Sequence, residues 1–202
     1  LEPQRACARD PLKMSSSHAS EHPEFIEDNS QRHKLGRSVW YQKGKFLGKG
    51  GFAKCYEAIE TETKTVFAVK IVNKKSVVKP RANAKLKSEI AIHRTLENER
   101  VVKMYSYFED SENVYILLEL CPGQTLNDLL KRRRRFSEAE ALFYMYDLIQ
   151  GVRYLHRNRV LHRDLKLGNL FLDADMKLKI GDFGLAAQLV HDDEKKKTIC
   201  GT

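Results

Sequence analysis

Between residues 162 and 169 the chain reads His162-Arg163-Asp164-Leu165-Lys166-Leu167-Gly168-Asn169, and Asp182-Phe183-Gly184 begins 13 residues after Asn169. Two aspartates and an asparagine on loops are a hard-oxygen set suited to magnesium, which takes few protein ligands besides the phosphates of a substrate. Taken singly, these residues are more simply explained as a core histidine, a surface arginine and aspartates in turns. Their order relative to motifs upstream decides between the two interpretations.

A glycine-rich segment lies upstream, between two predicted strands, and reads Leu47-Gly48-Lys49-Gly50-Gly51-Phe52-Ala53-Lys54-Cys55. Glycines let a backbone approach a polyphosphate closely, so that its N–H groups can point at the anionic oxygens. A tight hairpin is the commoner explanation for such a segment alone. The strand that follows, where those loops have a helix, argues against a dinucleotide-binding loop and against a Walker loop.

The run Phe67-Ala68-Val69-Lys70 places Lys70 inside an otherwise apolar strand. The ordinary explanation is a strand lysine that reaches out to water. However, Glu89 lies beside the buried stripe of a helix predicted over 82–98, and a buried carboxylate needs a cation. We therefore expect Lys70 and Glu89 to pair, with the amine near phosphates held under the glycine-rich segment.

The pattern along the chain predicts an α+β fold with two parts. Short runs rich in β-branched and aromatic residues predict strands at 45–47, 54–59, 65–72, 101–108 and 114–119. Their short polar connections predict an antiparallel meander, interrupted by the helix at 82–98. After Cys121-Pro122-Gly123 the spacing becomes helical: a short helix from Leu126, a long helix from a capping box at 137–140 to Asn158, and then a hairpin over 171–180.

The composition is that of a globular protein. The 202 residues are 42% hydrophobic and 31% charged, which excludes collagen-like, low-complexity and wholly disordered chains. Four separated cysteines predict neither a zinc site nor a disulfide framework, and favour a reducing compartment. There is no run apolar enough for membrane insertion. The net charge of +9 suits nucleic acid, acidic proteins or anionic membranes, and selects none of them.

Three regions follow from these patterns. Residues 1–38 are rich in proline and serine and are predicted to be a disordered leader. Residues 39–120 form the β-rich lobe, and residues 121–202 form the connector and part of a helical lobe. Because the chain starts with Leu1 and stops at Thr202 without a helix end or a polar tail, we expect a fragment.

The order of five elements is not expected by chance: glycine turn, strand lysine, helix glutamate, His-Arg-Asp with its asparagine, and Asp-Phe-Gly. Over about residues 41–202 the chain resembles the eukaryotic protein kinases. The runs 48–57, 118–121, 162–171 and 196–202 are more specifically similar to polo-like kinases. Ala53 in place of the third loop glycine, Cys55 in place of valine, and Phe171 in place of leucine are departures typical of that family.

The resemblance implies a bilobal kinase fold truncated in the activation segment, with ATP and Mg²⁺ as cofactors. It also implies that the long helix at 137–158 exposes an apolar face, which further helices cover in other members of the family. Lys70 would hold the α- and β-phosphates and pair with Glu89. Asp164 would orient the substrate hydroxyl and accept its proton, and Lys166 would neutralise charge on the transferred phosphoryl group. Asn169 and Asp182 would hold magnesium. The ATP pocket would comprise Leu47, Gly48, Lys49, Gly50, Gly51, Phe52, Ala53, Cys55, Ala68, Lys70, Leu118, Glu119, Cys121 and Phe171.

The resemblance also implies regulation and partners. Thr198 would be phosphorylated by an upstream activating kinase, and the phosphate would pair with Arg163; an unmodified threonine in a mobile basic loop is the alternative. His93, Met104, His162 and Phe183 match the side chains stacked between the lobes of active kinases, or are plain core. Protein substrates would carry Ser or Thr near acidic residues, steered by the basic run at 132–135. Such a run is usually a solvated face, and nucleic-acid binding is disfavoured because no aromatics are interleaved.

The preferred hypothesis is a polo-like serine/threonine kinase of cell-cycle and mitotic control, located in the cytoplasm and nucleus, including the centrosome or spindle. As a truncated chain it is expected to have little activity itself. Two alternatives stay open. A pseudokinase or nucleotide-binding scaffold would typically lack Lys70, Asp164 or Asp182, all of which are present. A basic nucleic-acid or scaffold module would bind its partner without ATP.

Overall fold

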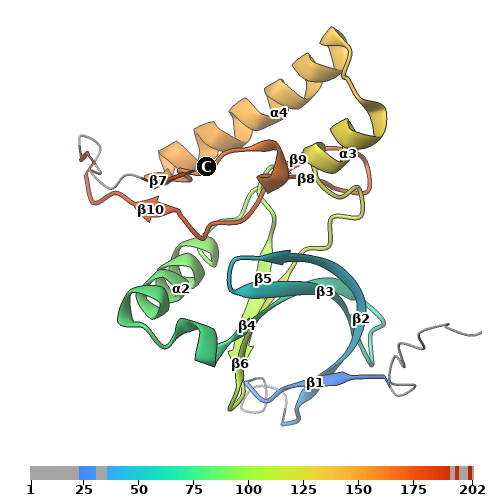
Figure 1. The fold of residues 1–202 in the computed structure, drawn as a ribbon, viewed down its shortest axis with the longest axis vertical. Helices are drawn as coiled ribbons and strands as arrows, with labels where there is room; N and C mark the ends of the chain where they lie inside the picture. Colours follow the sequence, from blue (N-terminus) through green and yellow to red (C-terminus); the bar gives the residue numbers. More distant parts are fainter. Residues whose placement is uncertain (1–22, 31–35, 192–193, 196–199, 202) are drawn as a thin grey trace, which may run out of the picture.

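The computed structural model describes residues 23–30, 36–191, 194–195 and 200–201. A six-stranded antiparallel sheet occupies one end of the molecule and α4 the other (Figure 1). The strands lie in the order β1-β2-β3-β4-β6-β5, and all their pairings are antiparallel, as predicted. The predicted meander is wrong at its end: β6 lies between β4 and β5, because the helical segment after β4 carries the chain past one strand position before β5 begins. Their bounds are β1 Phe25–Asp28, β2 Val39–Gly50, β3 Ala53–Glu60, β4 Val66–Asn73, β5 Met104–Glu109 and β6 Asn113–Leu118.

Strand β1 corrects one prediction. The expectation that 1–38 is a disordered leader is wrong for Phe25–Asp28, which pairs with β2 in antiparallel register. Ile26 is 5% exposed and packs with Tyr41 on the outer face of the sheet, so this burial stabilises the strand. The segment was missed because one strongly apolar inward residue among acids is too weak a period-2 pattern. Residues 1–22 lie outside the described part.

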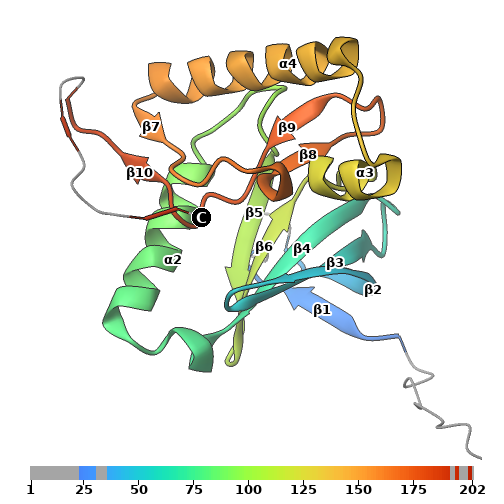
Figure 2. The same cartoon turned by 45° about the horizontal axis from the view of Figure 1, so that its top comes forward.

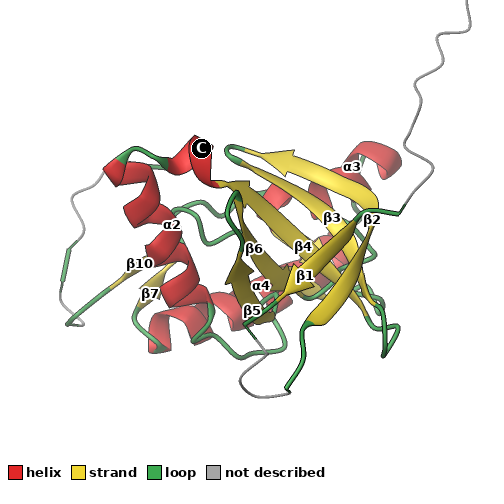
Figure 3. Cartoon of the chain, turned by 90° about the horizontal axis from the view of Figure 1, so that it is seen from below, coloured by secondary structure: helices red, strands yellow, loops and turns green. Residues whose placement is uncertain are grey.

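One helix, α2 (Pro80–His93), lies beside the sheet, after the short 3₁₀ turn η1 (Lys74–Val77) (Figure 3). Pro80 suits the first turn of a helix because its missing N–H would have no partner there. Leu86 and Ile90 are buried in a cluster with strand residues of β4, β5 and β6. This packing fixes the rotation of α2 and turns Glu89 toward the sheet. The helix ends five residues earlier than predicted, since turns at residues 94–95 and 99–100 follow it in place of helix.

The second part of the chain is built mainly from two helices and short strand pairs. A capping box begins each helix, Thr125 with Asp128 for the first and Ser137 with Glu140 for the second, and the latter confirms the prediction. β8 and β9 form the predicted hairpin, whereas the pair β7–β10 was not predicted. The elements are α3 Leu126–Arg133, α4 Glu138–Arg157, β7 Val160–Leu161, η2 Leu167–Asn169, β8 Leu170–Leu172, β9 Leu178–Ile180 and β10 Ala187–Gln188.

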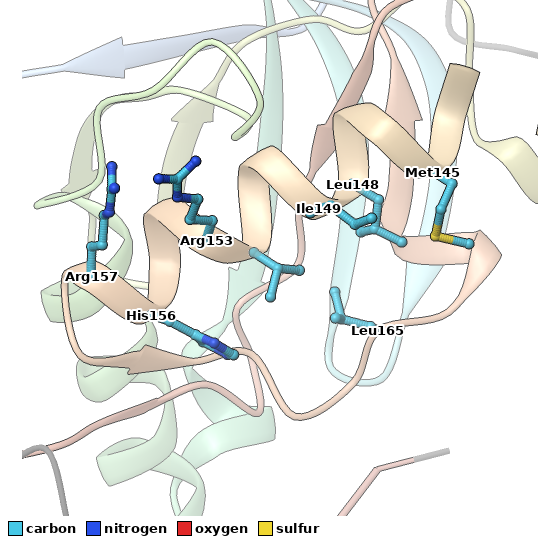
Figure 4. A pocket seen from close by; sticks show the side chains of 8 residues that line it. Met145, Leu148, Ile149, Arg153, His156, Arg157 and Leu165 are labelled. Atoms are coloured by element: carbon cyan, nitrogen blue, oxygen red, sulfur yellow. The ribbon is translucent and has the colours of Figure 1, made fainter. Parts of the chain in front are cut away.

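Helix α4 has an exposed apolar face, as expected from the sequence. The buried positions are Tyr144, Asp147, Gly151 and Leu155, which face β9 and the core. Much of the predicted apolar stripe is open instead, namely Leu142, Met145, Tyr146 and Ile149. Part of this face lines a groove of about 770 Å³ that reaches Leu165 (Figure 4). None of the described helices is both long and apolar enough to cross a membrane.

Candidate active site

Lys70 lies on β4 between two carboxylates that come from distant parts of the chain. Its Nζ is 2.5 Å from Glu89 Oε1 on α2 and 3.4 Å from Asp182 Oδ1, which follows β9. The side chains of Lys70 and Glu89 are 17% and 12% exposed, while that of Asp182 is 47% exposed. The predicted Lys70–Glu89 pair is therefore confirmed, and Asp182 joins it at the open side.

The surroundings of Lys70 hold its amine in the charged form. Burial disfavours the ammonium ion, but the carboxylates of Glu89 and Asp182 outweigh burial and raise the pKa of Lys70. The amine therefore stays protonated at physiological pH. A fixed cation of this kind suits phosphate oxygens, with Glu89 as its permanent partner.

The segment that contains Asp164 is held together by its own side chains. Asn169 Nδ2 donates to Asp164 Oδ2 at 3.0 Å and to the Asp164 carbonyl at 2.8 Å. Lys166 Nζ lies 2.9 Å from the same Asp164 Oδ2. These contacts fix the Asp164 carboxylate as an acceptor and place a cation beside it. The structure thus brings together Asp164, Lys166 and Asn169, to which the sequence analysis assigned roles in the reaction. The segment 162–169 that contains them is called the catalytic loop below.

Asp182 and Asn169 fit a magnesium ion by the chemistry of their donors. The Gly181 N–H donates to the Asn169 carbonyl at 3.0 Å, which ties the residue before Asp182 to the catalytic loop. Since Asn169 uses its amide nitrogen on Asp164, its amide oxygen lies on the opposite side of that group. Across the described residues, no group of three or more His, Cys, Asp or Glu could hold a metal alone. Two oxygen ligands completed by phosphates are what magnesium takes in nucleotide sites.

The glycine-rich segment is the hairpin between β2 and β3, with Gly48 opposite Cys55 and Gly50 opposite Ala53. A Cβ on Gly48, Gly50 or Gly51 would contact nothing within 4 Å, so packing inside the protein does not require these glycines. They leave bare backbone open to a ligand instead. Leu47 and Phe52 are exposed, Lys49 and its partner Lys54 lie opposite each other, and Ala53 is buried against the core.

The residues expected around adenine lie where β4, β6 and β8 adjoin the segment Cys121-Pro122-Gly123 between the two lobes. Ala68 pairs with Leu118 across β4 and β6, and Cys55, Cys121 and Phe171 are half-buried. Burial raises the pKa of the Cys55 thiol, and burial with the Glu119 carboxylate raises that of Cys121 to about 12. Both thiols are therefore neutral and serve as apolar lining.

Sequence reasoning missed what the Glu119 side chain does. Its Oε1 lies 2.8 Å from Nζ of the buried Lys179 on β9, and its Oε2 accepts the Lys103 N–H at 3.1 Å. The Glu119 side chain therefore bridges Lys179 on β9 and the backbone of Lys103. Alternation in the run Leu178-Lys179-Ile180, which places a lysine between two apolar residues, was the available signal.

The predicted stack of rings is present. The Phe183 ring centroid lies 4.6 Å from that of His93 and 5.1 Å from that of His162. His93 Nε2 is 2.7 Å from the Val102 carbonyl, and His162 Nε2 is 2.9 Å from the Gly181 carbonyl. Met104, the fourth residue predicted for this stack, is buried with Ile90 in the sheet core, and its place in the stack stays a prediction. The stack joins α2, the catalytic loop and the Asp-Phe-Gly segment.

This stack predicts a pH-dependent stability. Burial lowers the pKa of His93 to about 4, whereas the unfolded side chain titrates near 6.5. Below pH 6.5 the unfolded chain binds the proton more readily, so stability falls as pH decreases toward 4. From pH 7 to pH 5 the His93 contribution is about 2 kcal/mol. Urea unfolding of His93→Gln should therefore lose that much less stability over this interval than the unaltered chain.

The exposed His156 gives the matched control, because His156→Gln makes the same substitution outside the ring stack. Burial lowers the pKa of His162 as well, so part of the pH dependence will remain in His93→Gln. Identical pH profiles for His93→Gln and the unaltered chain would show that His93 does not titrate on unfolding.

Two further predicted features stand apart from this geometry. Arg163 has a positive φ of 64° and donates from Nε to the Leu185 carbonyl at 2.8 Å, while Thr198 lies outside the described residues. The basic run at 132–135 is exposed where α3 ends, at the opposite end of α4 from β7 (Figure 1). There Arg133 pairs with Glu140.

The site combines a lysine held by a helix glutamate, a glycine-rich hairpin, and two carboxylates on loops. This combination defines a class of phosphate-transferring protein. The chain belongs to the protein kinase family, since residues 41–202 match the protein kinase domain. The names of individual relatives indicate a narrower group within this family. It is 51% identical over 180 residues to the serine/threonine-protein kinase polo of Drosophila melanogaster, covering 89% of this chain and 30% of the relative.

Two other relatives agree with this placement. Identity to the serine/threonine-protein kinase PLK1 of Xenopus laevis is 50% over 188 residues, or 93% of this chain and 30% of that protein. Identity to the probable serine/threonine-protein kinase CCRP1 of Zea mays is 59% over 162 residues, or 80% and 26%. The predicted polo-like identity is confirmed, and the chain spans about 30% of the length of the polo and PLK1 relatives.

Proposed function

We propose that this protein is a serine/threonine kinase that transfers the γ-phosphate of ATP to serine or threonine of protein substrates. The observation that carries the proposal is the meeting of Lys70, Glu89 and Asp182 beside the Asp164–Asn169 loop. These residues are spread over more than a hundred positions, and all of them lie within residues 41–202, which match the protein kinase domain. All the named polo-type relatives are called serine/threonine kinases.

The proposed mechanism depends on positioning and charge. Lys70, held by Glu89, would bind the α- and β-phosphates, and the glycine-rich hairpin would cover them. Asn169 and Asp182 would hold Mg²⁺, which supplies charge neutralisation on the phosphates when bound. Asp164 would orient the substrate hydroxyl and accept its proton. Lys166, 2.9 Å from Asp164, would stabilise the charge that develops on the transferred group.

The test is nucleotide binding followed by transfer. Mg·ATP should raise the melting temperature of the chain, since a ligand that binds only the folded state stabilises it, whereas RNA or DNA should not. Labelled phosphate should then appear on a Ser/Thr peptide when the full-length enzyme is assayed. Binding without transfer by the full-length enzyme would favour the pseudokinase or scaffold, and stabilisation by nucleic acid alone would favour the basic module. We expect this chain on its own to transfer phosphate slowly, and the same assay tests that prediction.

Substrate preference and location belong to the proposal as well. A polo-like enzyme is expected to favour Ser or Thr near acidic residues, and the exposed basic run at 132–135 could attract them by charge. A peptide library without acidic preference would refute this steering. By family resemblance we place the protein in the cytoplasm and nucleus, at the centrosome or spindle during cell division. Imaging of the tagged protein tests that placement.

Thr198 is the proposed activation site. Its phosphate would pair with Arg163, whose backbone adjoins Asp164, and would order the segment by charge-assisted hydrogen bonds. Thr198→Val should lower the activity of the phosphorylated full-length enzyme severalfold, as measured by peptide phosphorylation after treatment with an upstream kinase. Thr65→Val, the same substitution at an exposed position just before β4, is the matched control and should leave the activity as it was. Equal rates for Thr198→Val and the unaltered enzyme would rule the role out.

A further inference from the structure

A second connector, formed by residues 94–103 between α2 and β5 and hereafter called the connector, does more than join these two elements. Residues 94–103 run beneath α4 and along β9 (Figure 2). The Ile180 N–H donates to the Arg100 carbonyl at 2.8 Å, and the Val102 N–H donates to the Ile180 carbonyl at 2.9 Å. Val101 and Ile180 form a parallel bridge. The connector is thus a third, short neighbour of the β8–β9 pair.

A buried ion pair joins this connector to α4. Arg100 Nε lies 2.7 Å from Asp147 Oδ1, and the two side chains are 15% and 3% exposed. The Arg100 Nε–H is not aligned as a hydrogen bond, so the contact is an ion pair. Asp147 Oδ2 accepts the Leu178 N–H at 3.1 Å. One buried carboxylate therefore links α4, the connector and the first residue of β9.

Gly151, one turn after Asp147, permits the close approach on which this junction depends. A Cβ at Gly151 would lie 2.8 Å from Ile180 Cδ1 and 3.2 Å from the Arg100 carbonyl oxygen. Helix α4 is therefore pressed against both the connector and β9. In such a close-packed junction, the Asp147 contacts determine where β9 sits along its axis.

β9 leads directly into the site. Only Gly181 separates Ile180 from Asp182, and Gly181 is held on both sides, by Asn169 and by His162 Nε2. Asp182 itself has a positive φ of 60°, so its backbone conformation depends on its neighbours. A displacement of β9 would consequently move the Asp182 carboxylate relative to Lys70 and Asn169.

We propose that Arg100 and Asp147 are positioning residues that set the placement of Asp182 and thereby the Mg²⁺ affinity of the nucleotide site. The inference rests on the proposed function, in which Asp182 holds the cation. Both residues act through β9. A buried ion pair is weak evidence for stability, because desolvation offsets its attraction, so a role in specifying position accounts better for this one.

The test compares metal-dependent with metal-free nucleotide binding. Asp147→Asn keeps the size of the side chain and an acceptor for Leu178, but removes the charge that faces Arg100. The Mg²⁺ concentration for half-maximal ADP binding should rise about tenfold, the lower end of losses from outer-shell partners of metals. ADP binding in EDTA should not change. Without nucleotide, the amides of Leu178 and Ile180 should exchange hydrogen faster.

A double variant separates positioning from stability. Arg100→Met with Asp147→Leu leaves neither charge unpaired, so its melting temperature should return to or exceed that of the unaltered chain. Its Mg²⁺ requirement should stay raised, because Leu178 has lost its acceptor. If the melting temperature and the Mg²⁺ requirement both returned to those of the unaltered chain, the Arg100–Asp147 pair would be only structural, and the inference would be overturned.

Glu97→Gln is the matched control, since it breaks an exposed ion pair with Lys103 on the same connector. It should change neither Mg²⁺ dependence nor amide exchange. If the unaltered chain fails to bind Mg·ADP, the proposed function fails and this inference fails with it. If that chain binds Mg·ADP and Asp147→Asn has the same Mg²⁺ dependence, only the inference is wrong.

Discussion

Replacing Asp164 by asparagine should reduce the rate of phosphate transfer about a thousandfold, within the range that loss of a general base produces. The asparagine can still accept the hydrogen bond from Asn169, so the loop should keep its shape. What disappears is the negative charge that takes the substrate proton and pairs with Lys166. The measurement is the turnover number for a Ser/Thr peptide, in the full-length enzyme.

The second half of this prediction concerns binding. Mg·ATP should stabilise Asp164→Asn against heat as strongly as it stabilises the unaltered protein, because Lys70, Asn169 and Asp182 are untouched. Asp175→Asn, an exposed change in the β8–β9 turn, is the control and should leave both measurements as they were. Turnover of Asp164→Asn within a few fold of the unaltered enzyme would remove Asp164 from the proposed mechanism.

The sequence was sufficient to predict those parts of the fold in which a single period dominates. The strands around Lys70 and the helix after Ser137 were found because a run of β-branched and aromatic residues and a capping box are both local signals. β1 was missed because Ile26 is its only strongly buried apolar residue. The pair β7–β10 was missed for a related reason: two-residue strands have no periodicity to detect.

The site was predictable in its members but not in its supports. Lys70 and Glu89 could be paired from the sequence, because a carboxylate beside a buried stripe needs a cation. The links from Arg100 to Asp147 and from Glu119 to Lys179 could not. Each joins residues tens of positions apart, and which charges meet depends on how α4 and β9 pack. An acid such as Asp147 on a helix looks like a solvent-facing residue until its neighbours are known.

Lys70→Met should abolish Mg·ATP binding and also destabilise the protein. The change removes the only cation known to contact both Glu89 and Asp182 in the described residues. Because Glu89 is 12% exposed, its unpaired carboxylate should cost about 3 kcal/mol of unfolding free energy, the smaller end for breaking a buried pair. Urea unfolding measures this loss, and a thermal shift with Mg·ATP measures binding.

The double variant Lys70→Met with Glu89→Gln distinguishes the two effects. Neutralising Glu89 removes the unpaired buried charge, so most of the lost stability should return, whereas nucleotide binding should not, since no amine faces the phosphates. Lys87→Met, at an exposed position on α2, is the control for loss of a lysine and should bind Mg·ATP normally. Stabilisation of the double variant by Mg·ATP equal to that of the unaltered chain would mean that Lys70 does not bind the phosphates. The convergence of three chain segments on this amine would then serve the fold alone.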